Sequence, residues 1–315
     1  MWGRNLARNL AQLGALAGVA DAVPNQADRF AAEFDTEAMT VAALLEQSDL
    51  DGVVIATAAP THADLACHAF AAGRHVYVEK PLALTLAEAE RMASAAAAAG
   101  RQMMVGHLIR YHDAFLELQE QVAAGVIGNI RHITANRLAM GRIRATESVI
   151  FDLCPHDLSL VLALMGEAPQ SVSCQGASHI TPGTPDIVSA WLGFSGARSA
   201  QLSTSWMTPY KEHRLTVTGS RGSIVFDDTR PWAEKLTLYR DHISPDGANF
   251  AIDRAAAVHL PVVESEPLKQ EMRAFLSCCE TNEAPPTGIE DALAVQRVLE
   301  TMNRQFAEYG AAEKG

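Results

Sequence analysis

Two short segments carry side chains that can move a proton near neutral pH. The first is Glu79-Lys80-Pro81, at the end of a predicted strand at residues 75–79. A Lys in a partly desolvated cleft has its pKa lowered and can then exchange protons near neutral pH. Because Pro81 fixes the backbone beside it, Lys80 is a candidate catalytic residue. An ordinary solvated surface Lys is the alternative interpretation.

The second segment is residues 151–157, in which Asp152 and His156 flank a Pro ahead of an apolar helix. His is the side chain best suited to take a proton at neutral pH, and a nearby carboxylate can hold its tautomer. Asp152 and His156 are therefore candidate catalytic residues. The alternative is structural: Asp152 caps the turn and His156 packs at the end of the helix.

The elements around the first segment alternate between strand and helix. Apolar strand-like runs lie at residues 16–20, 51–57, 75–79 and 103–106, and helical patterns lie at 4–13, 25–34, 41–47, 61–72 and 85–99. This alternation predicts an α/β fold with a parallel, doubly wound sheet. Ligands of such sheets bind beyond the carboxyl ends of the strands, which is where Glu79 and Lys80 are expected.

The beginning of the chain has the spacing of a dinucleotide-binding unit. Asp21 follows Gly3 by 18 residues, with a predicted helix and strand between them. An acid about 20 residues after a Gly-x-Gly-x-x-Gly turn binds the ribose hydroxyls. We interpret Gly3 as the last glycine of that turn, with the first strand and first two glycines missing and two strand edges exposed. The alternative is a helix that opens with Gly, followed by a surface acid.

Further residues are predicted to contact the cofactor because they lie next to these turns. Thr57, Pro60 and His62 follow a buried strand and open a helix, so this turn can line a bound nucleotide. The remaining predicted contacts are Trp2, Arg4, Glu79, Lys80 and His107. Basic residues at Arg137, Arg142 and Arg144 can clamp a pyrophosphate, because Arg offers a planar fork of donors. A solvated loop is the alternative for these three.

From about residue 130 the pattern changes to short strands. They are expected at residues 130–140, 170–179, 186–194, 198–207, 212–218 and 223–227, with helices only at 111–124, 156–165 and 289–309. This predicts an α+β domain with a mostly antiparallel sheet and one open face. We expect a cofactor domain at residues 1–108 and a substrate domain at 109–315, with helix 289–309 packing back on the first domain. The open sheet is the expected surface of a homo-oligomer.

The composition limits the possible partners and the compartment. A net charge of −12 argues against nucleic-acid binding, which needs a basic face. The five cysteines are odd in number and lack C-x-x-C spacing, so neither a disulfide framework nor a metal site is expected. No apolar run approaches the roughly 20 residues of a membrane span. The start lacks a signal-peptide layout, which predicts a cytoplasmic protein.

Taken together, these segments resemble the glucose-fructose oxidoreductase, inositol dehydrogenase and rhizopine catabolism (Gfo/Idh/MocA) family. The resemblance rests on Glu79-Lys80-Pro81 after a Rossmann sheet and on the later pair Asp152-x-x-x-His156. It implies that Lys80 and His156 contact the reacting sugar hydroxyl and that Asp152 supports them. The family often has Gly where this chain has Cys154, so we expect a slightly different loop geometry there.

Other segments are similar to family members that oxidise nucleotide-activated amino sugars, the UDP-N-acetylglucosamine 3-dehydrogenases. They are Asn136-Arg137-Leu138, Gly141-Arg142-Ile143-Arg144, Ser205-Trp206, Lys211-Glu212 and Phe226-Asp227-Asp228. The similarity implies oxidation of the C3 hydroxyl to a 3-keto sugar, with Lys211 joining the three arginines as a substrate ligand. An aminotransferase is the implied partner that consumes the product.

The cofactor that these residues favour is NAD. A carboxylate at Asp21 accepts ribose hydroxyls and repels the 2′-phosphate of NADP, which is the less favoured choice. The reaction requires a base for the hydroxyl proton, assigned to His156, and a donor that stabilises the oxygen, assigned to Lys80. The two roles can be exchanged. Alternatives are a dehydrogenase of UDP-N-acetylglucosaminuronate, inositol or a free sugar, and a non-catalytic sugar-nucleotide binding protein.

Overall fold

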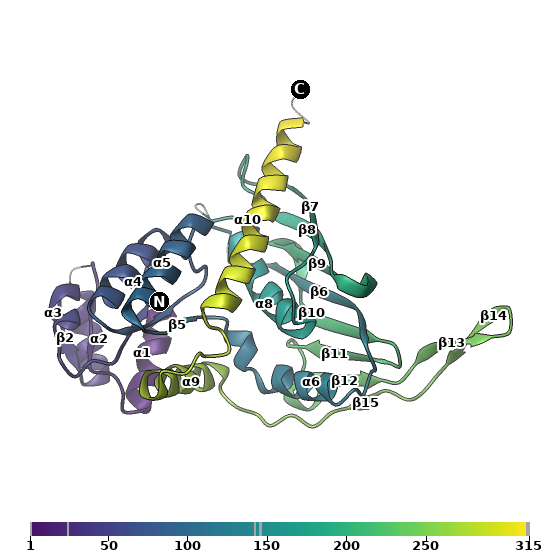
Figure 1. Ribbon diagram of the computed structural model, residues 1–315, viewed down its shortest axis with the longest axis horizontal. Helices are drawn as coiled ribbons and strands as arrows, with labels where there is room; N and C mark the ends of the chain where they lie inside the picture. Colours follow the sequence, from purple (N-terminus) through teal and green to yellow (C-terminus); the bar gives the residue numbers. More distant parts are fainter. Residues whose placement is uncertain (1, 24, 142, 145–146, 313–315) are drawn as a thin grey trace. The chain divides into compact units, whose positions relative to one another are not determined.

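The structure is a computed structural model that describes residues 2–23, 25–141, 143–144 and 147–312. It divides into two compact units, whose elements are labelled in Figure 1. Unit 1 contains Met1–Tyr111 and Glu266–Gln296, and unit 2 contains His112–Ser265 and Arg297–Gly315. The C-terminal part of the chain therefore contributes elements to both units.

Unit 1 holds parallel strands in two separate sheets. Strand β1 (Gly18–Val19) pairs with β2 (Glu37–Ala38), and β3 (Gly52–Ile55), β4 (His75–Val78) and β5 (Met103–Val105) form the second sheet in that order. The prediction of a Rossmann-type parallel sheet is confirmed. The helical elements of this unit are α1 (Trp2–Gln12), α2 (Gln26–Phe34), α3 (Val41–Leu45), η1 (Ala59–Thr61), α4 (His62–Ala71), α5 (Leu86–Ala99), η2 (Leu108–Tyr111) and α9 (Pro267–Thr281).

Strand β4 is buried on both of its faces, as a continuous apolar run predicts. Because side chains alternate along a strand, Val76 and Val78 pack in one core with α4 and α5. Tyr77 points the other way, into a second core with Leu6 of α1 and Phe275 of α9. The end of β4 is therefore fixed from both sides, and the residues that follow it start from a rigid position.

Helix α5 has a well-defined beginning that closes the segment after β4. The Thr85 hydroxyl accepts the N–H of Glu88, and the Glu88 carboxylate accepts the N–H of Thr85 in return. This reciprocal cap satisfies backbone donors that have no partner within the helix. Residues 79–84 are thus held between a central strand and a capped helix.

Unit 2 is built on an eight-stranded sheet with the order β15-β12-β11-β10-β6-β9-β8-β7. All neighbouring strands are antiparallel except β6 and β9, which are parallel. The strands are β6 (Ile130–Met140), β7 (Ser171–Ala177), β8 (Ile187–Gly193), β9 (Ser199–Ser205), β10 (Met207–Gly219), β11 (Ser223–Asp227), β12 (Leu236–Tyr239) and β15 (Val258–His259). The prediction of an α+β domain with a mostly antiparallel sheet is confirmed.

One face of this sheet is covered and the other is open. Helix α8 (Cys154–Met165) packs on β6 and β9, and α6 (Asp113–Ala123) packs on β11. On β8 the inward residues Val188, Ala190 and Leu192 are buried. The outward Ile187 and Trp191 are 38% and 49% exposed. The strict alternation along β8 therefore marks an open, partly apolar face.

Several elements differ from the sequence expectation. The strand expected at residues 16–20 is confined to Gly18–Val19, and α9 was not predicted. The hairpin of β13 (His242–Asp246) and β14 (Asn249–Asp253), which extends away from the large sheet within unit 2, was also missed (Figure 1). The remaining elements are α7 (Val149–Asp152), η3 (Ser195–Ala197), η4 (Trp232–Glu234) and α10 (Ile289–Ala312). Among the described residues, no helix is both long and apolar enough to cross a membrane.

Candidate functional site

The Glu79-Lys80-Pro81 segment begins directly at the carboxyl end of β4. Glu79 is buried, and its carboxylate accepts hydrogen bonds from Trp2 Nε1 at 2.5 Å, Tyr77 Oη at 3.0 Å and the Lys80 backbone N–H at 3.2 Å. The peptide bond between Lys80 and Pro81 is cis. Because Glu79 is anchored by three donors, it fixes the backbone from which Lys80 projects.

His62 links this segment to the turn that follows β3. Its ring is fully buried, with Nδ1 2.9 Å from the Pro81 carbonyl oxygen and Nε2 3.1 Å from the Thr57 carbonyl oxygen. A neutral imidazole carries one N–H, so it donates to one of these carbonyls at a time. The ring thereby holds the two strand-end turns beside each other. His62 therefore fixes the positions of Thr57 and Pro81.

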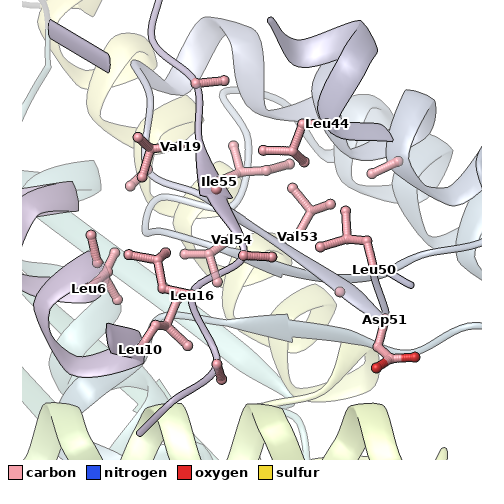
Figure 2. Close-up of a pocket in the computed structure, with 18 of the residues that line it drawn as sticks. Leu6, Leu10, Leu16, Val19, Leu44, Leu50, Asp51, Val53, Val54 and Ile55 are labelled. Atoms are coloured by element: carbon pink, nitrogen blue, oxygen red, sulfur yellow. The ribbon is translucent and has the colours of Figure 1, made fainter. Parts of the chain in front are cut away.

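An apolar groove lies between α1, β1 and β3 (Figure 2). Its volume is about 540 Å³, and Leu6, Leu16, Val19, Val53 and Ile55 are among the side chains that line it. Among the described strands, β1 pairs with β2 alone and β3 with β4 alone. The facing edges of β1 and β3 therefore have no ladder partner along this groove.

Three of the predicted cofactor contacts lie along the same groove, namely Gly3, Asp21 and Thr57. Asp21 follows β1 and is exposed, and its carboxylate accepts the Val23 N–H at 2.8 Å and the Gln26 side-chain amide at 2.7 Å. The structure thus gathers residues from α1 and from the ends of β1 and β3, as the Rossmann interpretation of the sequence requires.

The other residues around this groove have different environments. Pro60 is exposed on η1, and Thr57 forms a hydroxyl–hydroxyl hydrogen bond with Thr61 at 2.7 Å. Trp2 donates its indole N–H to Glu79. Arg4 is exposed and forms an ion pair with Glu33 of α2. Because Glu33 already binds the guanidinium, contact between Arg4 and a nucleotide requires this surface pair to open.

His107 follows β5 and is almost completely buried in unit 1. Among the residues that the structure describes, neither ring nitrogen has a hydrogen-bond partner. Burial lowers the pKa of His107 to about 4, and the positive charges of Arg110 and Lys80 act in the same direction. His107 is therefore a neutral imidazole at pH 7. Buried polar groups without partners are uncommon, and a bound ligand is one way to satisfy them.

In unit 2, Asp152 ends α7 and His156 lies in the first turn of α8. Asp152 is buried, accepts the indole N–H of Trp206 at 3.2 Å and lies 2.9 Å from Arg144 Nε. The sequence placed Trp206 in a family-like segment but did not assign it to the site. With a donor on one oxygen and a cation beside the other, Asp152 is held in a fixed orientation close to His156 in the chain.

Cys154 turns away from this segment into the core. It is fully buried, and its thiol donates to Thr204 Oγ1 at 3.4 Å. Burial raises the pKa of Cys154 to about 12, so the thiol stays protonated at neutral pH and is not a nucleophile. Its effect on the loop is therefore packing between α8 and β9.

Arg137 forms a buried, two-pronged ion pair with Asp157. Arg137 Nε is 2.9 Å from Asp157 Oδ2, and Nη2 is 2.9 Å from Oδ1. The third nitrogen, Nη1, is 3.4 Å from His213, whose pKa is lowered to about 4 by burial and by the nearby Arg137 charge. Because Nε and Nη2 both bind the Asp157 carboxylate, Arg137 fixes the beginning of α8 to β6. Asp157 was not among the predicted site residues.

The other predicted substrate ligands are more accessible. The Arg144 side chain is 39% exposed, although it also lies between Asp152 and Glu147. Lys211 is exposed on β10, within a stretch where the register with β6 is irregular. Arg142 lies outside the described residues. Arg144 and Lys211 are thus the described cations of this set that face solvent.

These features define a class of protein. A parallel sheet with a Lys at one strand end forms one unit, and a mixed sheet with a carboxylate–histidine segment forms the other. This is the architecture of a dinucleotide-dependent oxidoreductase with a second, separate domain. Residues 2–107 match the sequence model of an oxidoreductase family with an NAD-binding Rossmann fold, and residues 115–225 match the GFO/IDH/MocA C-terminal domain. The chain belongs to the Gfo/Idh/MocA family, and the expectation of an NAD-dependent oxidoreductase is confirmed.

Individual relatives are similar along most of the chain. A UDP-N-acetylglucosamine 3-dehydrogenase of Acidithiobacillus ferrooxidans is 34% identical over 217 residues, which are 68% of this chain and 67% of that protein. An inositol 2-dehydrogenase of Rhizobium meliloti is 27% identical over 305 residues, 93% and 89% of the two chains. A solved structure of the Acidithiobacillus enzyme matches with a TM-score of 0.85 and 26% identity, covering 98% of this chain and 96% of that one. The relatives thus include two substrate classes, nucleotide sugars and inositols.

Proposed function

We propose that the protein oxidises the C3 hydroxyl of a UDP-N-acetylglucosamine-like sugar to a ketone, with NAD as the oxidant. The observation that carries the proposal is the anchored Asp152 beside His156, with Arg144 next to it as a partly exposed cation. An inositol carries no phosphate, whereas a nucleotide sugar brings a diphosphate that such a cation can bind. The 34% identity to a UDP-N-acetylglucosamine 3-dehydrogenase supports the same choice.

The residues of unit 1 fit NAD. Asp21 presents an exposed and oriented carboxylate, Thr57 and Pro60 are exposed beyond β3, and the buried nitrogens of His107 need a partner. Asp21 would hold the ribose hydroxyls, and its charge disfavours the phosphate of NADP. When bound, NAD supplies the acceptor for the hydride.

The protein's own part in the reaction is to orient the sugar and to move one proton. In the proposed step the O3–H bond breaks and its proton goes to His156. The C3–H bond breaks with its electron pair as a hydride, which NAD would accept when bound. Lys80 donates a hydrogen bond to the same oxygen and stabilises the negative charge that develops on it. Asp152 supports the imidazolium that forms. Lys80 and His156 can exchange these two roles.

A second candidate is the oxidation of inositol. The observation in its favour is the match to an inositol 2-dehydrogenase, which extends over 93% of this chain. The chemistry at the hydroxyl is the same, but no diphosphate is present for Arg144 or Lys211 to bind. Because Arg144 also lies beside Asp152, Lys211 is the informative position. Substituting Lys211 should lower activity on a nucleotide sugar and leave activity on inositol unchanged, which separates the candidates. Oxidation of UDP-N-acetylglucosaminuronate or a free sugar, and sugar-nucleotide binding without turnover, are the remaining alternatives.

The direct test is a substrate panel with NAD. We expect NADH to form with UDP-N-acetylglucosamine and more weakly with its uronic acid form, and not with myo-inositol or glucose. Reduction of the product with borodeuteride followed by fragmentation mass spectrometry should place the label at C3. Turnover only of sugars without a nucleotide, or a label at another carbon, contradicts the substrate assignment.

The proposed product also defines a partner reaction and an assembly. A 3-keto sugar is the substrate of an aminotransferase, so we propose an enzyme of that class as the next step. The open face of β8, with exposed Ile187 and Trp191, is the proposed contact between copies of the chain.

A further inference from the structure

Behind the Lys80 turn, unit 1 buries two carboxyl groups beside one phenol. Tyr77 and Glu271 are 0% exposed and Glu79 is 8% exposed. Tyr77 lies in β4, Glu79 follows β4, and Glu271 comes from α9. Two buried carboxylates in one place are unfavourable unless one of them is neutral or both are fully hydrogen-bonded.

The two carboxyls are not equally hydrogen-bonded. Glu79 accepts from Trp2, Tyr77 and the Lys80 backbone N–H. Neither oxygen of Glu271 has a partner of good hydrogen-bond geometry among the described residues, and the polar group beside it is the Tyr77 hydroxyl. Burial raises the pKa of Glu271 well above its usual value, and the nearby Glu79 charge raises it further. Burial also raises the pKa of Glu79, but its three hydrogen-bond donors and the Lys80 charge act in the opposite direction. Of the two carboxyls, Glu79 is therefore the one that carries the negative charge, and Glu271 the one that keeps its proton.

The space around the cluster is shaped to hold it. A side-chain carbon at Gly106 would lie 2.6 Å from Tyr77 Oη and 2.9 Å from Glu79 Oε2, so the end of β5 must carry glycine here. The Tyr77 ring meets the Phe275 ring at 5.8 Å between centroids, in an edge-on arrangement. Phe275 lies one helical turn after Glu271 on α9, so the same helix face fixes both the phenol and its acidic neighbour.

We propose that Glu271 is a positioning residue for Lys80. Glu271 acts on Lys80 through Tyr77 and Glu79. As a neutral acid, Glu271 donates its hydrogen to Tyr77 Oη. The phenol then keeps its own hydrogen on Glu79, and Glu79 fixes the Lys80 backbone and compensates its charge. The inference rests on the proposed function only in taking Lys80 as the group that contacts the substrate hydroxyl.

The other ionisable groups near this chain of contacts are cationic or phenolic. Lys80 acts on Glu79, and Tyr111 lies within electrostatic reach of Glu271. Arg110 acts on Tyr111. Burial raises the pKa of Tyr111, so it is a neutral phenol near neutral pH. The ionisable groups that the proposal links are thus Glu79, Glu271 and the Lys80 that they position.

The test compares Glu271→Gln with Glu271→Leu, with Glu280→Leu at the exposed end of α9 as the control. Infrared difference spectra between wild type and Glu271→Gln should show the C=O band of a protonated carboxyl at pH 7. The pKa of Lys80 is then measured by NMR of ¹³C-labelled lysines, assigned with Lys80→Met. We expect Glu271→Gln and Glu280→Leu to leave the Lys80 titration unchanged, because an amide still donates to Tyr77. Glu271→Leu should shift it.

With a substrate that turns over, Glu271→Leu should lower kcat about tenfold without changing the affinity for NAD, and Glu271→Gln should restore it. Absence of the protonated band, or a Lys80 titration unchanged in a folded Glu271→Leu protein, overturns the inference. If Glu271→Leu does not fold, Tyr77→Phe provides the same comparison, since it removes the bridging hydroxyl alone. The infrared and NMR readouts need no substrate. An inactive wild type with both signals present would therefore overturn the proposed function and leave this inference standing.

Discussion

Each carboxylate of the candidate site is anchored by a named donor. Glu79 is held by Trp2 and Tyr77, and Asp152 is held by Trp206. Asp157 is bound in two-pronged fashion by Arg137. Buried acids with such donors are fixed in orientation, so they orient their neighbours. The proposed function assigns proton transfer to Lys80 and His156, their neighbours in the chain.

Removing either proton-transfer group should lower the chemical rate and leave cofactor binding nearly intact. Lys80→Met and His156→Asn are each expected to reduce kcat by about 100- to 10,000-fold, the usual contribution of a positioned acid or base. The double variant should be little worse than the poorer single one, because both groups act on one transition state. Single-turnover hydride transfer measures the effect.

Two controls belong with this prediction. Asp152→Asn should cost less than His156→Asn, since an amide keeps a hydrogen bond but no longer supports a cationic imidazole. Circular dichroism establishes that each variant is folded. Wild-type rates in both Lys80→Met and His156→Asn would place the site elsewhere.

The stability of the protein should depend on His107 in acid. In the folded protein its pKa is lowered from 6.5 to about 4 by burial, so the unfolded chain binds the proton first as the pH falls. Stability from His107 is fully present above pH 6.5 and is lost toward pH 4, by about 2 kcal/mol at pH 5. Urea unfolding of wild type and His107→Gln at pH 7 and pH 5 measures this loss.

Other groups also titrate in this range, so the quantity compared is the loss of unfolding free energy between pH 7 and pH 5 in each protein. His107→Gln should lose about 2 kcal/mol less than wild type between the two pH values. Equal losses in both proteins would show that His107 is protonated in the folded state.

At the scale of elements, unit 1 leaves a structural gap between β1 and β3. Both strands run parallel to their partners, and the edges that face the groove have no ladder partner among the described strands. Leu6 and Leu10 of α1 line one wall, and Val53 and Ile55 lie on the β3 side (Figure 2). Such a groove can accept an added β-strand, because it has strand edges without a ladder partner on both sides and apolar walls.

Filling this groove should stabilise unit 1. A variant carrying an apolar segment of about five β-branched residues and a short Gly-rich turn ahead of Trp2 should melt several degrees higher than the 315-residue chain. The gain comes from pairing both edges and burying the apolar walls. Calorimetry of the two proteins measures it.

The matched control carries an extension of equal length made of Gly, Ser and Asn, which cannot bury apolar surface. It should melt with the unextended chain. Equal midpoints for all three proteins would mean that the groove does not accept a strand.

The sequence was most informative where one short-range pattern decided the structure. The continuous apolar runs before Thr57 and Glu79 predicted parallel strands, of which β4 is buried and β3 is mostly half-buried. The alternating short strands after residue 130 predicted a sheet with one open face. The β13–β14 hairpin carried an unused signal, because Asp246-Gly247 is a typical turn between alternating residues. Helix α9 also had helical spacing, at Leu268, Met272 and Phe275, but Glu271 interrupts that apolar face.

Contacts between distant segments could not be predicted in this way. Nothing near Glu79 in the sequence indicates that Glu271 of α9 lies beside Tyr77, or that Trp206 donates to Asp152. These partners are fixed by how strands and helices pack, and a periodicity argument does not determine packing partners. The sequence therefore supplied the candidate residues Lys80, Asp152 and His156, whereas the groups that hold Glu79 and Asp152 emerged only from the structure.

At the scale of the whole molecule, the open face of the unit 2 sheet is the surface that we propose for contact between copies of the chain, because it exposes apolar side chains. Trp191 stacks on His132 from β6 with 5.2 Å between ring centroids. Trp191 is exposed and His132 is half-buried. An exposed apolar patch on a sheet face favours association of two copies.

A charge on this face should separate the copies. Trp191→Glu is expected to shift the wild-type oligomer to a monomer in light scattering after size exclusion, because a buried unpaired carboxylate opposes the contact. Val263→Glu, at an exposed position outside the strands, should leave the assembly unchanged. A monomeric wild type, or an oligomer that survives Trp191→Glu, contradicts the assignment of this face.

The chain divides its chemistry between a unit that fits NAD and a unit that carries Asp152 and His156, and one isotope experiment tests their joint action. UDP-N-acetylglucosamine carrying deuterium at C3 is mixed with NAD and the protein, and the reduced cofactor is analysed by mass spectrometry. The proposed function predicts NADH containing the deuterium, formed at a reduced rate relative to unlabelled substrate, and none with Lys80→Met in the same time. Unlabelled NADH, or no NADH while myo-inositol is oxidised, would contradict the proposal that C3 of a nucleotide sugar donates the hydride.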